Sequence, residues 1–130
     1  MHPLVQIPES AGPVCITCNL PEVKNPLRHS ATTLSGIDLG KIKNWQDPAI
    51  SKDTSGVHLP NNIIVIAHRS DSSGTTNIFT TYLANTSPEW QKQVGKGLSV
   101  SWPAGLGAKG SEGVTRIVKQ TPSGIGYVEC

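Results

Sequence analysis

The chain has 130 residues, of which 36% are hydrophobic and 15% are charged, and this favours a single domain spanning residues 1–130. Its 11 basic and 9 acidic residues give a formal net charge of +2 without a basic cluster, which argues against nucleic-acid binding. No run approaches the roughly 18–20 apolar residues of a membrane span. The amino terminus also lacks the regions of a signal peptide. We expect neither feature in this chain.

The first half of the chain indicates short elements separated by turns. Residues 1–12 predict an extended entry, and residues 13–18 predict a strand. Leu34, Ile37 and Leu39 form the apolar face of a helix predicted at residues 31–39. Asp47 and Pro48 then predict a short helix, with Asp47 as its cap and Pro48 as its first residue.

The second half alternates strands with helices. The predicted elements are, in order, a strand at 63–67, a helix at 76–84, a helix at 87–95, a strand at 98–102, a helix at 111–120 and a strand at 124–129. Ser87 and Pro88 mark the start of the second of these helices. Glycines at 105, 107 and 110 predict a flexible loop. Val114, Ile117 and Val118 form the buried stripe of the last helix.

Strands that alternate with helices predict the α/β class. We expect an open, mostly parallel sheet with helices on both faces. Ligands of such sheets bind beyond the carboxyl ends of the strands.

The segment HRSDSSGTT, residues 68–76, lies at such an end, between an apolar strand and a helix. A helix that begins after Ser, Gly and Thr presents free backbone N–H groups and the positive end of its dipole, which together favour an anion. Arg69 adds a planar fork of donors suited to phosphate or carboxylate. An ordinary helix cap, with Arg69 paired to Asp71 on the surface, also fits this sequence.

Three cysteines are present. Cys15 and Cys18 resemble half of a redox or zinc motif, but the expected strand turns them to opposite faces, and a second ligand pair is missing. We interpret them as small buried hydrophobes, predict no metal site and expect no cofactor. Cys130, the last residue, is interpreted as marking where the chain was cut.

Separated motifs in a consistent order resemble the phosphate-binding (PstS) family of ABC-type phosphate importers. They are LGKIKNWQDPAI at 39–50, HRSD at 68–71, SGTT at 73–76, SPEW at 87–90, VGKG at 94–97, WP at 102–103, Gly107, KG at 109–110, EG at 112–113 and GIGYVE at 124–129. The resemblance runs from about residue 4 to the end. It implies one lobe of a type II periplasmic binding protein-like fold, the second lobe, in a fragment without the first.

The resemblance also implies the site. Inorganic phosphate would be held by the guanidinium of Arg69 and by backbone N–H groups and hydroxyls of Ser73, Gly74 and Thr75, with Asp71 fixing the fork of Arg69. The parent protein would be periplasmic, or extracellular and lipid-anchored, and would deliver phosphate to transporter permease subunits. Where the family usually has Asp-Gly-Ser-Gly-Thr, this chain has Ser72, which would cost about 1–2 kcal/mol if a positive φ were required.

Binding is favoured over catalysis, since no base is marked beside Ser73, and we interpret His68 as packing or solvent-facing. We therefore expect no enzyme and no catalytic residue. Two alternatives stay open, an enzyme acting on phosphate esters and a free-standing phosphate sensor or interaction domain.

Overall fold

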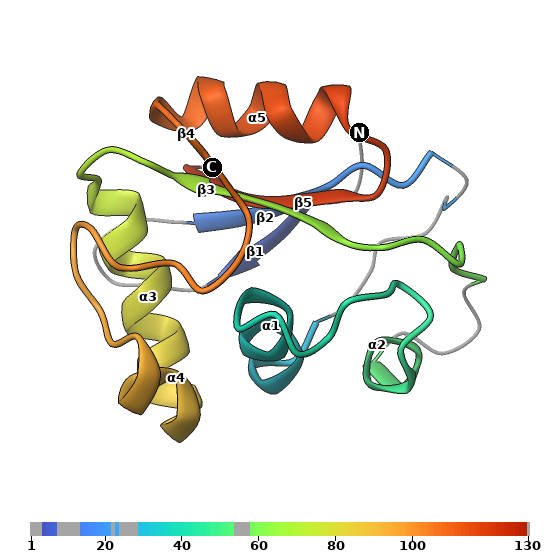
Figure 1. The fold of residues 1–130 in the computed structure, drawn as a ribbon, viewed down its shortest axis with the longest axis horizontal. Coiled ribbons are helices and arrows are strands. Elements are labelled where there is room, and N and C mark those ends of the chain that lie inside the picture. Colours follow the sequence, from blue (N-terminus) through green and yellow to red (C-terminus); the bar gives the residue numbers. More distant parts are fainter. Residues whose placement is uncertain (1–3, 8–13, 22, 24–28, 54–57, 130) are drawn as a thin grey trace.

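The computed structural model describes residues 4–7, 14–21, 23, 29–53 and 58–129, with only the backbone of residues 4–7 (Figure 1). The helices and strands follow one another as β1 (Leu4–Ile7), β2 (Val14–Cys18), α1 (Ala31–Asp38), α2 (Pro48–Asp53), β3 (Val65–Arg69), α3 (Gly74–Thr86), α4 (Pro88–Gln93), β4 (Leu106–Ala108), α5 (Gly110–Gln120) and β5 (Gly124–Glu129).

The strands form one open sheet in the order β1-β2-β5-β3-β4. β3 is parallel to both of its neighbours, β5 and β4, whereas β1–β2 and β2–β5 are antiparallel pairs. The α/β class and the open sheet are confirmed, but the sheet is mixed rather than mostly parallel. The predicted extended entry contains β1, and the short connection from β1 to β2 permits antiparallel pairing.

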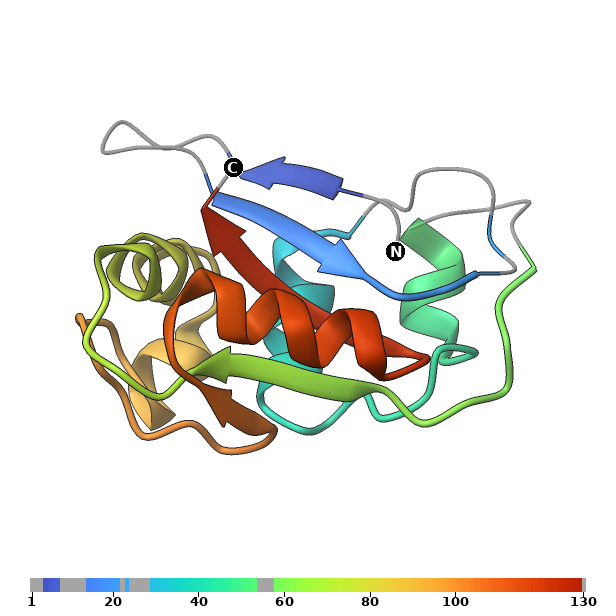
Figure 2. The same ribbon diagram turned by 90° about the horizontal axis from the view of Figure 1, so that it is seen from above.

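Helices cover both faces of the sheet, as predicted. Figure 1 shows α5 against one face and α1, α2, α3 and α4 on the side of the other. Viewed from above in Figure 2, α5 lies across β5 and β3. Since each face is covered, every residue of β2 is buried.

The core is divided unequally by the sheet. Ala67, Val114 and Val118 form a small buried cluster beneath α5. The larger cluster lies on the opposite face and includes Leu34 and Ile37 of α1, Phe79 and Leu83 of α3, and Trp45, Trp90 and Tyr127. The carboxyl end of β3 passes between these two layers, which fixes where the loop after it emerges.

The prediction of a strand at residues 98–102 is wrong. The chain is irregular there, and β4 forms instead within the predicted glycine loop. Within this segment the ring of Trp102 stacks on His68 with centroids 4.8 Å apart, whereas Leu98 is 52% exposed. The carbonyl of Leu98 meanwhile accepts a hydrogen bond from the Ser73 N–H at 2.9 Å. Gly105, at φ +106°, then turns the chain into β4.

The cysteines behave differently from one another. Cys18 is a free, buried thiol, as predicted, and burial raises its pKa to about 12. Cys15 is also buried but is disulfide-bonded, so its interpretation as a simple buried hydrophobe is wrong. Cys130 lies outside the described residues. A strand pattern alone records burial and not the distance to another sulfur.

Candidate anion-binding site

The strand, loop and helix around residue 70 are arranged as the sequence predicts, with shifted boundaries. β3 ends at Arg69 and α3 begins at Gly74, two residues before the predicted start. Ser73 is the N-cap, with extended φ and ψ of −153° and 132°. Its Oγ accepts a hydrogen bond from the Thr76 N–H at 3.1 Å. This cap fixes the direction in which the first turn of α3 leaves the sheet.

Arg69 and Asp71 form a two-pronged ion pair. Arg69 Nε donates to Asp71 Oδ1 and Arg69 Nη2 donates to Oδ2, each at 2.7 Å. The hydrogen bonds from Arg69 hold the pKa of Asp71 well below its usual range, and those to Asp71 raise the pKa of Arg69. The pair leaves the Nη1 hydrogens and one Nη2 hydrogen of the guanidinium for a ligand. The carboxylate thus fixes the fork without using all of its donors.

Asp71 also reaches the amino end of a second helix. Its Oδ1 accepts the N–H of Gly110, the first residue of α5, at 3.2 Å. The N-cap residue of α5, Lys109, makes no side-chain capping bond. The negative charge of the carboxylate is stabilised by the positive end of the helix dipole. Sequence reasoning missed this role of Gly110, because nothing local brings residues 71 and 110 together.

The first turn of α3 presents its donors unequally. The Ser73 N–H donates to the carbonyl of Leu98, so Ser73 has its hydroxyl hydrogen and not its amide for a ligand. Gly74 and Thr75 lie in the first turn, where backbone N–H groups have no intrahelical acceptor. A Cβ at Gly74 would meet no atom within 4 Å. Ser73 is thus limited to its side chain, while Gly74 and Thr75 keep their backbone N–H groups for a ligand.

Ser72 is not strained. Ser123, at φ 72°, is the one non-glycine residue with positive φ in the described part of the chain, so φ at Ser72 is negative. The expected cost of Ser72 does not arise, and the serine fits the loop that the structure adopts. Sequence reasoning missed Ser123, which turns the chain from α5 into β5.

His68 is half-buried and packs against Trp102, as one of its two interpretations predicts. Its ring stacks on Trp102 at an interplanar angle of 12°, and its Nδ1 lies 3.1 Å from the carbonyl oxygen of Arg69. Burial lowers its pKa. The ring is therefore part of the support beneath the loop.

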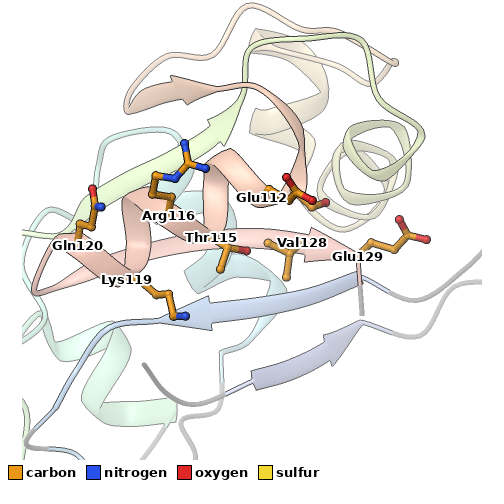
Figure 3. Close-up of a pocket in the computed structure, with 8 residues that line it drawn as sticks. Glu112, Thr115, Arg116, Lys119, Gln120, Val128 and Glu129 are labelled. Carbon is orange, nitrogen blue, oxygen red and sulfur yellow. The ribbon is translucent and has the colours of Figure 1, made fainter.

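The surface around these groups is open on one side. A hollow of about 560 Å³ is lined by Arg69, Lys109, Gly110, Ser111, Glu112 and Glu129. A neighbouring hollow of about 490 Å³ lies beside α5 and is lined in part by Thr115, Lys119 and Val128. Figure 3 shows these side chains. Residues 73–75 line neither hollow. Arg69 thus lines an open surface hollow beside the start of α5 and not an enclosed cavity.

The described residues show neither a metal cluster nor a membrane-spanning helix. Within the described residues, no group of three or more His, Cys, Asp or Glu side chains is placed to hold a metal ion. The same residues include no helix with the length and apolarity needed to cross a membrane.

Curated relatives share close to half of the aligned residues. The phosphate-binding protein PstS of Pasteurella multocida is 48% identical over 129 residues, covering 98% of this chain and 38% of the relative. The PstS of Methanocaldococcus jannaschii is 44% identical over 133 residues, covering 96% of this chain and 34% of the relative. The chain thus spans well under half the length of these relatives.

Solved structures match the fold. A phosphate-binding protein from Stenotrophomonas maltophilia superposes with a TM-score of 0.65 and 25% identity, over 98% of this chain and 37% of that one. A high-affinity periplasmic phosphate-binding protein, solved with phosphate bound, gives 0.66 and 26% over 97% of this chain and 34% of its own. The family model of the PBP superfamily domain matches residues 1–130. The chain belongs to this family of periplasmic binding protein-like domains and resembles part of the PstS phosphate-binding proteins.

Proposed function

We propose that this chain is the phosphate-binding second lobe of a solute-binding protein that serves an ABC-type phosphate import system. Arg69, Ser73, Gly74 and Thr75 bind inorganic phosphate. The observation that carries the proposal is the guanidinium fork of Arg69, fixed by Asp71 at the carboxyl end of β3, where α3 begins. Charged N–H donors and helix amino-terminal N–H donors then converge on one anion.

The surroundings favour holding an oxyanion over transforming it. The hydroxyl of Ser73 is the candidate nucleophile considered in the enzyme alternative. Its oxygen caps α3 by accepting a hydrogen bond from the N–H of Thr76. Activation would need a base within hydrogen-bond distance. The nearest histidine in sequence, His68, is stacked on Trp102 and turned toward a backbone carbonyl. Binding needs no group beyond those already present.

The open side of the site supports a two-lobed parent protein. The relatives named PstS are much longer than this chain, which covers 38% of the Pasteurella multocida protein. A first lobe of similar architecture would close over Arg69 and the start of α3. A carboxylate in that lobe would accept the proton of HPO₄²⁻ and repel sulfate, which has no proton to donate at neutral pH. The parent protein would act outside the cytoplasm and pass phosphate to the permease subunits.

Titration of this chain with phosphate and with sulfate tests the proposal. We expect weak binding of phosphate, with a Kd of about 1 mM or weaker, corresponding to ~4 kcal/mol. Nuclear magnetic resonance is suited to this range, and the shifted signals should be those of Arg69 and the first turn of α3. Shifts elsewhere, or none at all, would contradict phosphate binding. Micromolar binding that excludes sulfate would contradict the single-lobe description.

A parallel assay with phosphate esters distinguishes phosphate binding from the alternative, an enzyme that acts on phosphate esters. The proposal predicts no turnover above that of a heat-denatured sample. Turnover that is lost in both Arg69→Ala and Ser73→Ala would instead establish an esterase or phosphatase at the same site.

A further inference from the structure

A buried tyrosine lies directly behind the anion-binding loop. Tyr127 belongs to β5, whose parallel pairing with β3 ends at Ala67 and Gly126. Two residues further along β3, the backbone N–H of Arg69 donates to the hydroxyl oxygen of Tyr127 at 3.1 Å. The tyrosine hydroxyl therefore takes the position in which a backbone acceptor would continue the sheet.

The same hydroxyl reaches the helix. Tyr127 Oη and Thr76 Oγ1 are 2.7 Å apart and share a hydrogen bond. Thr76 also donates its N–H to Ser73 Oγ, so one residue joins the tyrosine to the cap of α3. A single oxygen thus links the last residue of β3 with the first turn of α3.

Packing holds this oxygen in place. Tyr127 is 2% exposed and Thr76 is 1% exposed. The tyrosine ring stacks on Phe79 with centroids 4.5 Å apart and on Trp102 at 5.5 Å. Burial also raises the pKa of Tyr127, which keeps the hydroxyl protonated. A buried hydroxyl that is held from both sides cannot turn to water without losing its partners.

We infer that Tyr127 is a positioning residue, whose hydroxyl sets the distance between Arg69 and the first turn of α3 and so matches the two halves of the site to one oxyanion. Its effect on phosphate affinity rests on the proposed function. Its effect on the geometry of the loop does not, because the hydrogen bonds are made without a ligand. Tyr127 does not itself touch phosphate.

The first arm of the test needs no phosphate. Tyr127→Phe removes the hydroxyl and keeps the stacked ring. Amide hydrogen exchange of Arg69 should accelerate by about tenfold, since its acceptor is lost. The matched control is Tyr82→Phe, because Tyr82 is the other tyrosine of the chain and is half-buried in α3. Equal exchange at Arg69 in the two variants would overturn the inference.

The second arm measures phosphate affinity at a temperature where all variants are fully folded. Tyr127→Phe should weaken binding by about tenfold, and Thr76→Val by a similar factor. Because the two residues share one hydrogen bond, the double variant should be little weaker than either single variant. Thr76→Ser keeps the hydroxyl and should retain the affinity. Losses that simply multiply, or an unchanged affinity in Tyr127→Phe, would overturn the inference.

The two arms distinguish failure of the proposed phosphate binding from failure of the positioning role of Tyr127. If the unaltered chain binds no phosphate, the proposed function fails, and the exchange of Arg69 alone decides the role of Tyr127. If Tyr127→Phe does not fold, Thr76→Val leaves β5 intact and carries the affinity measurement, with Thr76→Ser as its control; equal affinities in these two variants would overturn the inference. In a folded Tyr127→Phe variant, weaker phosphate binding without faster exchange at Arg69 would show that the tyrosine acts by some other route, and would also overturn the inference.

Discussion

Asp71 and Asp38 are carboxyl groups in opposite environments. Asp71 lies at the edge of the sheet and is paired with a cation, whereas Asp38 is buried beneath the sheet. Asp71 receives two hydrogen bonds from Arg69 and one from the Gly110 N–H, and the pair with Arg69 holds its pKa well below the usual range. Asp38 ends α1, is 7% exposed, and lines a cavity of about 10 Å³ with apolar neighbours and Tyr127. Burial raises its pKa to about 7.

The comparison shows that the surroundings of an aspartate, and not its residue type, decide the direction in which its pKa shifts. A paired carboxylate stays ionised, whereas a buried one becomes less stable when it ionises. Asp71 is ionised at any physiological pH and orders the arginine fork. Asp38 is driven toward its neutral form by desolvation, and the described residues that line its cavity include no cation. The substitutions at Asp38, Arg69 and Asp71 described below each alter one side of this contrast.

The largest effect is expected from Asp38→Asn. The pKa of an ordinary aspartate, 3.8, rises to about 7 in this fold, so ionisation favours the unfolded chain. The stability present below pH 4 is therefore lost as the pH rises from about 4 to about 7. Asparagine removes this loss and should stabilise the protein at pH 8 by up to about 4 kcal/mol. Urea unfolding at pH 8 checks this, and an unchanged midpoint would contradict it.

Asp38→Asn should also reveal the pH dependence of stability that comes from His29, which has the opposite sign to that of Asp38. The ring nitrogens of His29 are buried with no hydrogen-bond partner among the described residues, and burial lowers the pKa of His29 from 6.5 to about 4. Protonation of His29 favours unfolding, so its contribution is lost as the pH falls from about 6.5 to about 4. In the unaltered chain this offsets Asp38. We expect a steeper loss of stability toward acid in Asp38→Asn, measured by the melting temperature at a series of pH values.

Arg69→Ala removes the cation from the other side of the contrast. It should weaken phosphate binding by about a hundredfold or more, because charged hydrogen bonds are lost and Asp71 is left to repel the anion. Phosphate titration by nuclear magnetic resonance measures the loss. Arg116→Ala, on the exposed face of α5, is the matched control and should bind like the unaltered chain. Equal losses in both variants would show a diffuse effect of charge.

Asp71→Asn should have a smaller effect on the same titration. The amide keeps one acceptor oxygen for Arg69 or for Gly110, but it cannot hold both prongs of the fork. We expect phosphate to bind about tenfold more weakly, through a less ordered guanidinium. An affinity as low as that of Arg69→Ala would mean that Asp71 does more than position the arginine.

The smallest effect is expected at Ser72. Since φ at this position is negative, Ser72→Gly relieves no strain and adds freedom to the unfolded chain. Stability should fall by about 1 kcal/mol or less, with phosphate affinity within about twofold. A marked gain in affinity would show that the ligand-bound loop needs a positive φ at this residue.

Local signals account for the elements that were predicted well. Ser87 with Pro88, and Asp47 with Pro48, start α4 and α2 as predicted, because capping depends on residues within one turn. The alternating segment at 98–102 shows the limit of such signals, since it is irregular in the structure, with Leu98 exposed and Trp102 packed on His68. The sequence predicts only an extended segment where β1 forms, because the spacing of residues does not show which strand it will pair with.

The sequence by itself determined the α/β class, the strand, loop and helix around residue 70, and the residue types that suit an oxyanion. These follow from period, capping and charge over a few residues. Only the tertiary structure decided that Asp71 spans Arg69 and Gly110, that Tyr127 lies behind the loop, and that Asp38 is buried among apolar side chains. The physical reason is that hydrogen bonding and desolvation depend on neighbours in space, which the mixed sheet order β1-β2-β5-β3-β4 brings together from distant parts of the chain.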